Sequence, residues 1–143
     1  MSQPNASSIW DVSTSNRVSI DSLKNAPGLQ RRFARGETVI REGDTADAMY
    51  FVLDGVLHVI KNYRTVDERY VASLHAGDLF GEMALFLKES RTATIVAIED
   101  TTVIEINKDT VVEFMKSRPE TTYAIVELLC KRLRNVLDTL ADY

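Results

Sequence analysis

Two apolar runs, at residues 49–53 and 56–60, are separated only by Asp54 and Gly55. Both runs are rich in aromatic and β-branched residues, which favour β-strands. Asp-Gly is one of the preferred two-residue connections between antiparallel strands. The pattern therefore predicts a β-hairpin over residues 49–60, and it indicates that the fold is built around antiparallel strands.

Further short strands are predicted at residues 30–34, 38–40, 70–74, 94–98 and 102–106. All six glycines of the chain fall between the apolar runs and not inside them, as turn residues do: Gly28, Gly36, Gly43, Gly55, Gly77 and Gly81. Short strands with such close spacing are typical of an antiparallel sandwich or roll.

After Asn107 the spacing of the apolar residues changes from two to nearer 3.6, which predicts helices. A short helix should end before Pro119, and a longer one should run from about residue 119 to residue 140. The longer helix has one apolar face, made of Val126, Leu129, Cys130, Leu133, Val136, Leu137 and Leu140. Cys130 is expected to be buried there. The sequence leaves open whether this face covers the domain itself or a second copy of the chain.

These elements predict an α+β fold, with an antiparallel, jelly-roll-like β-roll over residues 29–107 and two C-terminal helices over residues 108–141. A short additional helix is expected just after Gly81. Residues 1–28 form a polar N-terminal arm that carries a single apolar pair, Ile9 and Trp10. A chain of 143 residues is the right length for one domain, here residues 29–143, with one core.

The composition narrows the possible functions. With 45% hydrophobic and 27% charged residues the chain is neither disordered nor collagen-like. It contains no apolar run long enough for a membrane segment, and its start lacks the features of a secretory signal, so a cytoplasmic location is expected. The net charge of −4 disfavours nucleic-acid binding. One cysteine and two separated histidines predict neither a metal site nor a metal-dependent enzyme.

The residues that can bind a ligand lie in one stretch, which runs from residue 77 to 94 and reads Gly-Asp-Leu-Phe-Gly-Glu-Met-Ala-Leu-Phe-Leu-Lys-Glu-Ser-Arg-Thr-Ala-Thr. Gly81 lets the backbone approach a bound group, and the amides of Met83 and Ala84, at the start of a helical turn, can bind an anion. Arg91 offers a planar fork that can bind two phosphate oxygens, and Glu82 can accept a hydrogen bond from a sugar hydroxyl. Together these groups suit a sugar phosphate.

The string Phe-Gly-Glu-Met-Ala-Leu, followed by a spacer and Arg-Thr-Ala-Thr, strongly resembles the phosphate-binding cassette of cyclic-nucleotide-binding domains. Such domains occur in bacterial catabolite activator proteins, in regulatory subunits of cyclic-nucleotide-dependent kinases and in cyclic-nucleotide-gated channels. The resemblance covers about residues 29–140, including the turns at 33–37 and 41–44. It implies a cyclic mononucleotide ligand, cyclic AMP or cyclic GMP, with no further cofactor and no catalytic activity.

The resemblance also implies roles for individual residues of the cassette. Gly81 and Glu82 match the residues that bind the ribose 2′-hydroxyl, and the amide of Ala84 matches the one that meets the cyclic phosphate. Arg91 matches the arginine that pairs with this phosphate. Thr92 follows it, where a hydroxyl can bind the phosphate and the exocyclic amine of a syn guanine. Thr92 thus favours tolerance of cyclic GMP, although domains of this kind that respond to cyclic AMP also carry hydroxyl residues there.

The base of the ligand is usually covered by the last helix in such domains. An alignment on the triplet Lys-Arg-Leu places Arg132 and Val136 where related channels have a lid arginine and an apolar contact with the purine. Asn135 is a neighbouring polar candidate, and Leu74 and Met83 would line the other side of the pocket. For Arg132, a lid position and a solvent-exposed position fit the sequence equally well.

The resemblance therefore predicts a non-enzymatic sensor, in which ligand binding repositions the last helix. Two alternatives stay open: a roll that has lost ligand binding and serves as a protein-interaction scaffold, and a sensor of a cyclic dinucleotide. A regulator of the catabolite-activator type would carry a helix-turn-helix after the long helix, and the sequence ends at Tyr143, so no DNA-binding domain is expected. The remaining expected partners are an unidentified protein effector and a second copy of the chain, bound through the last helix.

Overall fold

The computed structural model describes residues 28–141. The predicted N-terminal arm, with Ile9 and Trp10, lies outside the described residues except for Gly28. Within the described range, eight strands form two four-stranded antiparallel sheets. The first sheet has the order β1 (Leu29–Phe33), β8 (Thr101–Asn107), β3 (Ala48–Asp54) and β6 (Leu79–Phe80). The second has the order β2 (Thr38–Ile40), β7 (Thr94–Ala97), β4 (Val56–Lys61) and β5 (Arg69–His75).

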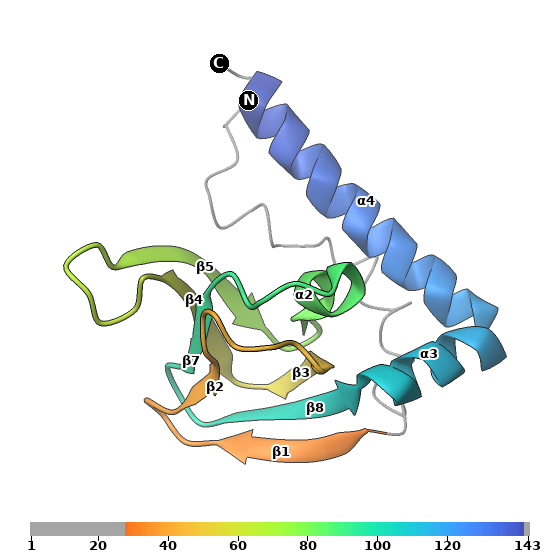
Figure 1. Ribbon diagram of the computed structural model, residues 1–143, viewed down its shortest axis with the longest axis horizontal. Coiled ribbons are helices and arrows are strands. Elements are labelled where there is room, and N and C mark those ends of the chain that lie inside the picture. Colours follow the sequence, from red (N-terminus) through yellow and green to blue (C-terminus); the bar gives the residue numbers. More distant parts are fainter. Residues whose placement is uncertain (1–27, 142–143) are drawn as a thin grey trace.

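Three helices complete the described part of the chain: α2 (Glu82–Leu87), α3 (Lys108–Ser117) and α4 (Pro119–Ala141). The helix α2 lies between the roll of strands and α4, and the C-terminal half of α4 extends past the roll (Figure 1). The predicted α+β fold with a β-roll and C-terminal helices is confirmed. None of the described helices combines the length and the low polarity that are needed to cross a membrane.

The strands predicted from the sequence are all present, with ends that differ by at most one residue, but the hairpin pairing is wrong. The runs on either side of Asp54 and Gly55 belong to different sheets, since β3 pairs with β6 and β8 whereas β4 pairs with β5 and β7. The chain changes sheet at Gly55, which has φ 103°. A Cβ atom at this position would lie 2.6 Å from the Cα of Thr101, so the corner packs directly against the start of β8. Gly55 is required by this close approach and not by a hairpin turn.

The burial of β3 explains the change of sheet. Met49 and Phe51 face one core, which α3 and α4 cover, while Tyr50 and Val52 face a second core between the two sheets. β3 lies between these two cores, so both of its faces are apolar. A hairpin partner in the same sheet would need two apolar faces as well. In β4, by contrast, buried and half-buried residues alternate, as in a strand with a single core face.

The buried face of α4 differs from the predicted one. Ile125 and Leu128 are buried in the core beneath the helix, together with the neighbouring Ala124. Most of the predicted apolar face is more than half exposed, with exposed fractions of 51, 58, 55 and 65% for Val126, Leu133, Leu137 and Leu140. Cys130 is also exposed, so its predicted burial is wrong. The helix has two apolar stripes, and the one that packs on the roll also carries a buried arginine, Arg132.

Candidate ligand-binding site

The motif that begins at residue 77 forms the edge of a pocket between α2 and the second sheet. Gly81 follows the last residue of β6, has φ 80° and immediately precedes α2. A Cβ atom at Gly81 would lie 2.8 Å from Nη1 of Arg91. Glycine is therefore required twice here, by the left-handed backbone and by the approach of the arginine.

The pocket has a volume of about 70 Å³. It brings together seven of the predicted site residues: Leu74, Gly81, Glu82, Met83, Ala84, Arg91 and Thr92. Sequence reasoning missed several apolar lining residues, namely Ile40, Val59, Phe80 and Ile95. Each of these belongs to a predicted strand or to the motif itself. Alternation along β4 could have assigned Val59 to an inner face, although not to a pocket.

Arg91 is the cation among the residues that line this pocket, with only 6% of its surface exposed. Its Nη1 donates a hydrogen bond to the carbonyl oxygen of Gly81 at 2.7 Å, and its Nη2 donates one to that of Ala48 at 2.6 Å. The guanidinium carbon lies 5.9 Å from the centroid of the Tyr50 ring, within the range of a cation–π contact. Burial lowers the pKa of Arg91 from its usual value, and nearby negative groups oppose this effect. The side chain is nevertheless a cation at neutral pH.

The aromatic ring of Tyr50 packs against the guanidinium of Arg91. The same ring stacks on Phe80, with centroids 5.0 Å apart, and the hydroxyl of Tyr50 donates a hydrogen bond to Glu105 at 2.9 Å. Burial, followed by the hydrogen bond to Glu105, raises the pKa of Tyr50 to about 12. The phenol therefore stays neutral over the physiological range, and it holds an aromatic face beneath the guanidinium of Arg91.

Glu82 and Arg132 form a buried ion pair between the cassette and α4. Glu82 is 1% exposed and Arg132 is 6% exposed. Nη1 of Arg132 donates to Oε1 of Glu82, and Nη2 donates to the carbonyl oxygen of Leu79. The solvent-exposed alternative for Arg132 is therefore wrong. Removing one partner of a buried pair leaves an uncompensated charge, so this contact ties α4 firmly to the cassette.

The three residues proposed for the lid lie outside the pocket. Arg132 contacts Glu82 from the side of α4, and Asn135 and Val136 are half-buried about one turn further along the same helix. None of the three is among the residues that line the described pocket. Their predicted contact with a base thus requires α4 to adopt a different position.

The comparisons with known proteins agree with this geometry. Residues 30–118 match the family model of the cyclic nucleotide-binding domain. The cyclic AMP receptor protein of Thermus thermophilus is 32% identical over 107 residues, which are 74% of this chain and 50% of that protein. The chain thus spans about half the length of this curated relative.

Solved structures share the fold. The catabolite activator protein of Thermus thermophilus matches with a TM-score of 0.72 and 26% identity, over 91% of this chain and 61% of that one. The c-di-GMP-responsive global regulator CLP of Xanthomonas campestris matches with a TM-score of 0.70 and 25% identity, over 87% of this chain and 61% of that one. Because the family model covers well over half of the chain and the cassette residues surround one pocket, the chain belongs to the cyclic nucleotide-binding domain family.

Proposed function

We propose that this chain is a non-catalytic regulatory module that binds a cyclic mononucleotide between α2 and the second sheet and transmits binding through α4. The observation that carries the proposal is the environment of Arg91. Its guanidinium is buried at the pocket, and its hydrogen-bond partners are two neutral carbonyl oxygens. A buried cation gains energy from an anion that reaches it, and a phosphate matches the two-pronged geometry of arginine.

The surrounding residues suit the other parts of the ligand. The cyclic phosphate would lie against Arg91 and the backbone amide of Ala84, and the ribose hydroxyl would bind Glu82 and the backbone of Gly81. The purine would contact the apolar lining, in particular Leu74 and Met83. No cofactor other than the nucleotide is needed in this scheme.

The pocket must widen to admit such a ligand. Its volume of about 70 Å³ lies below the about 300–1,000 Å³ that are common for pockets of small molecules. Arg91 and Gly81 both line the pocket, and the hydrogen bond between them ties the two together. A phosphate can replace the carbonyl of Gly81 as the acceptor. Binding therefore moves Gly81 and the start of α2, on which Glu82 lies.

The ion pair between Glu82 and Arg132 carries this movement to α4. A ribose hydroxyl that binds the carboxylate of Glu82 changes the hydrogen bond that this carboxylate accepts from Arg132. A resulting shift of α4 brings Asn135 and Val136 toward the base. Ligand binding would thus change the population of α4 positions, by as much as the ligand prefers one position over the other.

For the identity of the ligand we favour cyclic AMP or cyclic GMP over a cyclic dinucleotide. The curated relative is named for cyclic AMP, and one structural neighbour is named for c-di-GMP. A pocket that must already widen for one nucleotide is a poor fit for two. The hydroxyl of Thr92 next to Arg91 supports tolerance of cyclic GMP, because it can bind the exocyclic amine of guanine.

We also propose that α4 forms a homodimer. Its exposed apolar residues follow one another at alternating steps of three and four, as in a coiled coil: Tyr123, Val126, Cys130, Leu133, Leu137 and Leu140. The last three of them belong to the C-terminal half of α4 by their residue numbers, and that half extends past the roll (Figure 1). Sedimentation of the wild type and of Leu133→Glu tests this, since a charge in the stripe should yield monomers. Identical sedimentation of the two proteins contradicts the proposal.

Calorimetric titration with cyclic AMP, cyclic GMP and c-di-GMP tests the ligand assignment, with Arg91→Leu as the control. The wild type should bind a mononucleotide with micromolar or tighter affinity. The variant should bind about 100-fold more weakly, because it loses two charge-assisted hydrogen bonds to phosphate of about 1.5 kcal/mol each.

Other outcomes identify the alternatives. Tight binding of c-di-GMP without binding of either mononucleotide would favour the dinucleotide sensor. No binding of any of the three would favour the interaction scaffold. Equal affinity of wild type and Arg91→Leu for a mononucleotide would remove Arg91 from the site.

A further inference from the structure

The segment that leaves the cassette has no strand partner. In the described part of the chain, residues 91–93 lie between an isolated bridge at Ser90 and the start of β7 and belong to neither sheet. This segment contains Arg91 and Thr92, to which we assign contacts with the phosphate and the base. Arg91 is buried, Ala93 is half-buried and Thr92 is exposed, so neither a sheet ladder nor complete burial fixes the backbone of this segment, and contacts from neighbouring turns and side chains hold it.

The turn around residue 43 holds the two ends of the segment. The amide of Gly43 donates to the carbonyl of Arg91, and the amide of Arg91 donates to the carbonyl of Asp44, both at 2.8 Å. At the other end, the amide of Glu42 donates to Oγ1 of Thr94 at 3.1 Å. These bonds leave the carbonyl group of Thr92, in the middle of the segment, to a different partner.

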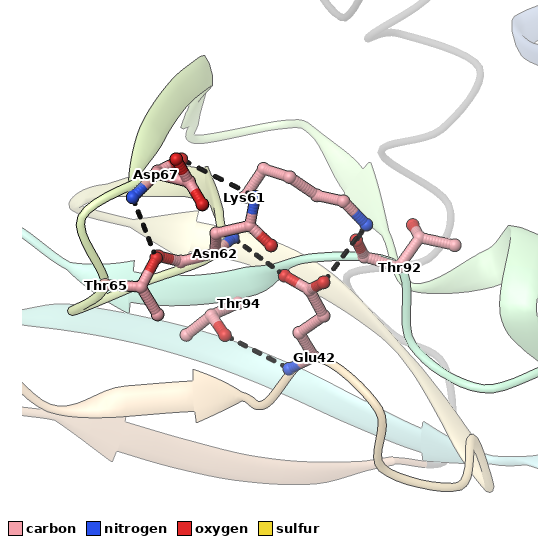
Figure 2. Close-up of polar contacts among 7 residues, drawn as sticks. All are labelled: Glu42, Lys61, Asn62, Thr65, Asp67, Thr92 and Thr94. Carbon is pink, nitrogen blue, oxygen red and sulfur yellow. Dashed lines mark hydrogen bonds and ion pairs between the residues drawn. The ribbon is translucent and has the colours of Figure 1, made fainter.

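That partner is Lys61, the last residue of β4. Its Nζ donates a hydrogen bond to the carbonyl oxygen of Thr92 at 2.6 Å and lies 3.1 Å from Oε2 of Glu42 (Figure 2). Oε1 of Glu42 accepts a hydrogen bond from the amide of Asn62 at 2.9 Å. Glu42 thus holds both the ammonium group of Lys61 and the peptide group that follows it. These contacts, that of Asn62 first, lower the pKa of Glu42, so it is ionised at neutral pH.

We propose that Lys61, held in place by Glu42, is a positioning residue that sets the orientation of Arg91 and Thr92 for the ligand. The inference rests on the proposed function, because it concerns the same site. Lys61 and Glu42 together carry no net charge, so their contribution is the placement of the Thr92 carbonyl and not a long-range attraction for phosphate.

A charge effect and a positioning effect make opposite predictions for Glu42→Gln. If Lys61 acted through its charge, removal of the neighbouring carboxylate would strengthen the binding of an anion. If Glu42 holds Lys61 in place, the same substitution weakens binding. The isosteric change therefore separates the two effects without altering the size of the side chain.

The experiment is a calorimetric titration of wild type, Lys61→Met, Lys61→Arg and Glu42→Gln with cyclic AMP and cyclic GMP. Loss of one hydrogen bond from a charged donor predicts about tenfold weaker binding for Lys61→Met and about threefold weaker binding for Glu42→Gln. The ratio of the two affinities should change in Lys61→Met, because Thr92 moves. Lys61→Arg should restore most of the affinity, since it keeps the charged donor.

Lys116→Met is the matched control, because Lys116 is exposed on α3 and lies outside the site. It should bind as the wild type does. Wild-type affinity and ratio in Lys61→Met, or stronger binding in Glu42→Gln, would overturn the inference.

Hydrogen–deuterium exchange of the protein without nucleotide gives an independent readout. The amides of residues 91–94 should exchange faster in Lys61→Met than in Lys116→Met, because the segment loses its central contact. Unchanged exchange overturns the positioning role. Failure of the wild type to bind either nucleotide would instead overturn the proposed function, and the exchange rates would then still decide whether Lys61 holds the segment.

Discussion

Arg91 and Arg132 both contact the stretch from β6 to α2, and each is 6% exposed, yet their partners differ in kind. Arg132 contacts the carboxylate of Glu82 and the carbonyl of Leu79. Arg91 donates to two carbonyl oxygens, and among the described residues it takes part in no ion pair. Equal burial thus conceals two roles, because Arg132 contacts a carboxylate directly, whereas Arg91 hydrogen-bonds only to neutral carbonyl oxygens and interacts with negative groups without a direct ion pair.

The difference indicates which arginine holds the fold together and which is available to a ligand. A cation that is paired with a buried carboxylate is costly to remove, because the carboxylate then remains alone in a dry environment. A cation bound by neutral carbonyls can exchange one of them for an anion and gain energy. We therefore expect Arg132 to dominate stability and Arg91 to dominate affinity.

The largest expected effect is that of Arg132→Met on stability. This substitution leaves Glu82 buried without its cation, so the free energy of unfolding should fall by about 3–5 kcal/mol. Urea unfolding followed by circular dichroism measures the change. Arg134→Met, at an exposed position of the same helix, should remain within about 0.5 kcal/mol of the wild type.

The assignment of stability to Arg132 and of affinity to Arg91 is wrong if Arg91→Met destabilises the protein as much as Arg132→Met does. We expect the loss in Arg91→Met to be about 1–2 kcal/mol, because two carbonyl groups lose a donor and no buried carboxylate loses its partner. Equal losses would mean that both arginines are structural.

A double-mutant cycle measures the coupling between Glu82 and Arg132. Glu82→Gln combined with Arg132→Met should recover about 1–3 kcal/mol relative to the sum of the two single losses, because the double variant no longer contains an unpaired buried charge. The same unfolding measurement on all four proteins gives the coupling energy. Additive losses would show that the two side chains act independently, in spite of their contact.

Gly81→Ala tests whether the position of Arg91 depends on the missing Cβ. The left-handed backbone should cost about 1–2 kcal/mol of stability, and the new methyl group should displace Nη1 of Arg91 and weaken ligand binding. Gly36→Ala is the control, because Gly36 has φ 90° but open space around it. Both variants should lose stability in urea unfolding, Gly81→Ala more than Gly36→Ala because its Cβ also meets Arg91, and only Gly81→Ala should lose affinity. Unaltered affinity in Gly81→Ala would show that the arginine tolerates displacement.

The smallest expected effect is the alkaline dependence of stability that Tyr50 causes. The folded protein holds the phenolic proton up to a pKa of about 12, whereas an unfolded chain releases it near 10. Stability linked to Tyr50 is therefore complete below pH 10 and is lost as the pH rises toward 12. Tyr50→Phe should flatten this fall by about 1 kcal/mol at pH 11, because only part of the linked stability is lost by that pH. Thermal melts between pH 9 and pH 11 measure it, and parallel curves for the two proteins would contradict the expectation.

Expectations from the sequence succeeded where they depended on neighbouring residues. The strands appear where the apolar runs are, and the predicted cassette residues at positions 81–84, 91 and 92 line one pocket. They failed where a partner had to be chosen. The runs on either side of Gly55 looked like a hairpin but joined different sheets, and the apparent core face of α4 turned out to be exposed, with Cys130 on it.

The physical reason is the range over which each feature is decided. Backbone conformation, turn positions and the close spacing of Glu82 and Arg91 follow from residues that are near one another in the chain, so local patterns alone settle them. The partner of a strand edge, of a helix stripe or of a buried charge is selected from the whole chain. Only the folded arrangement placed Arg132, 50 positions away in sequence, against Glu82, and brought Lys61 to the carbonyl of Thr92.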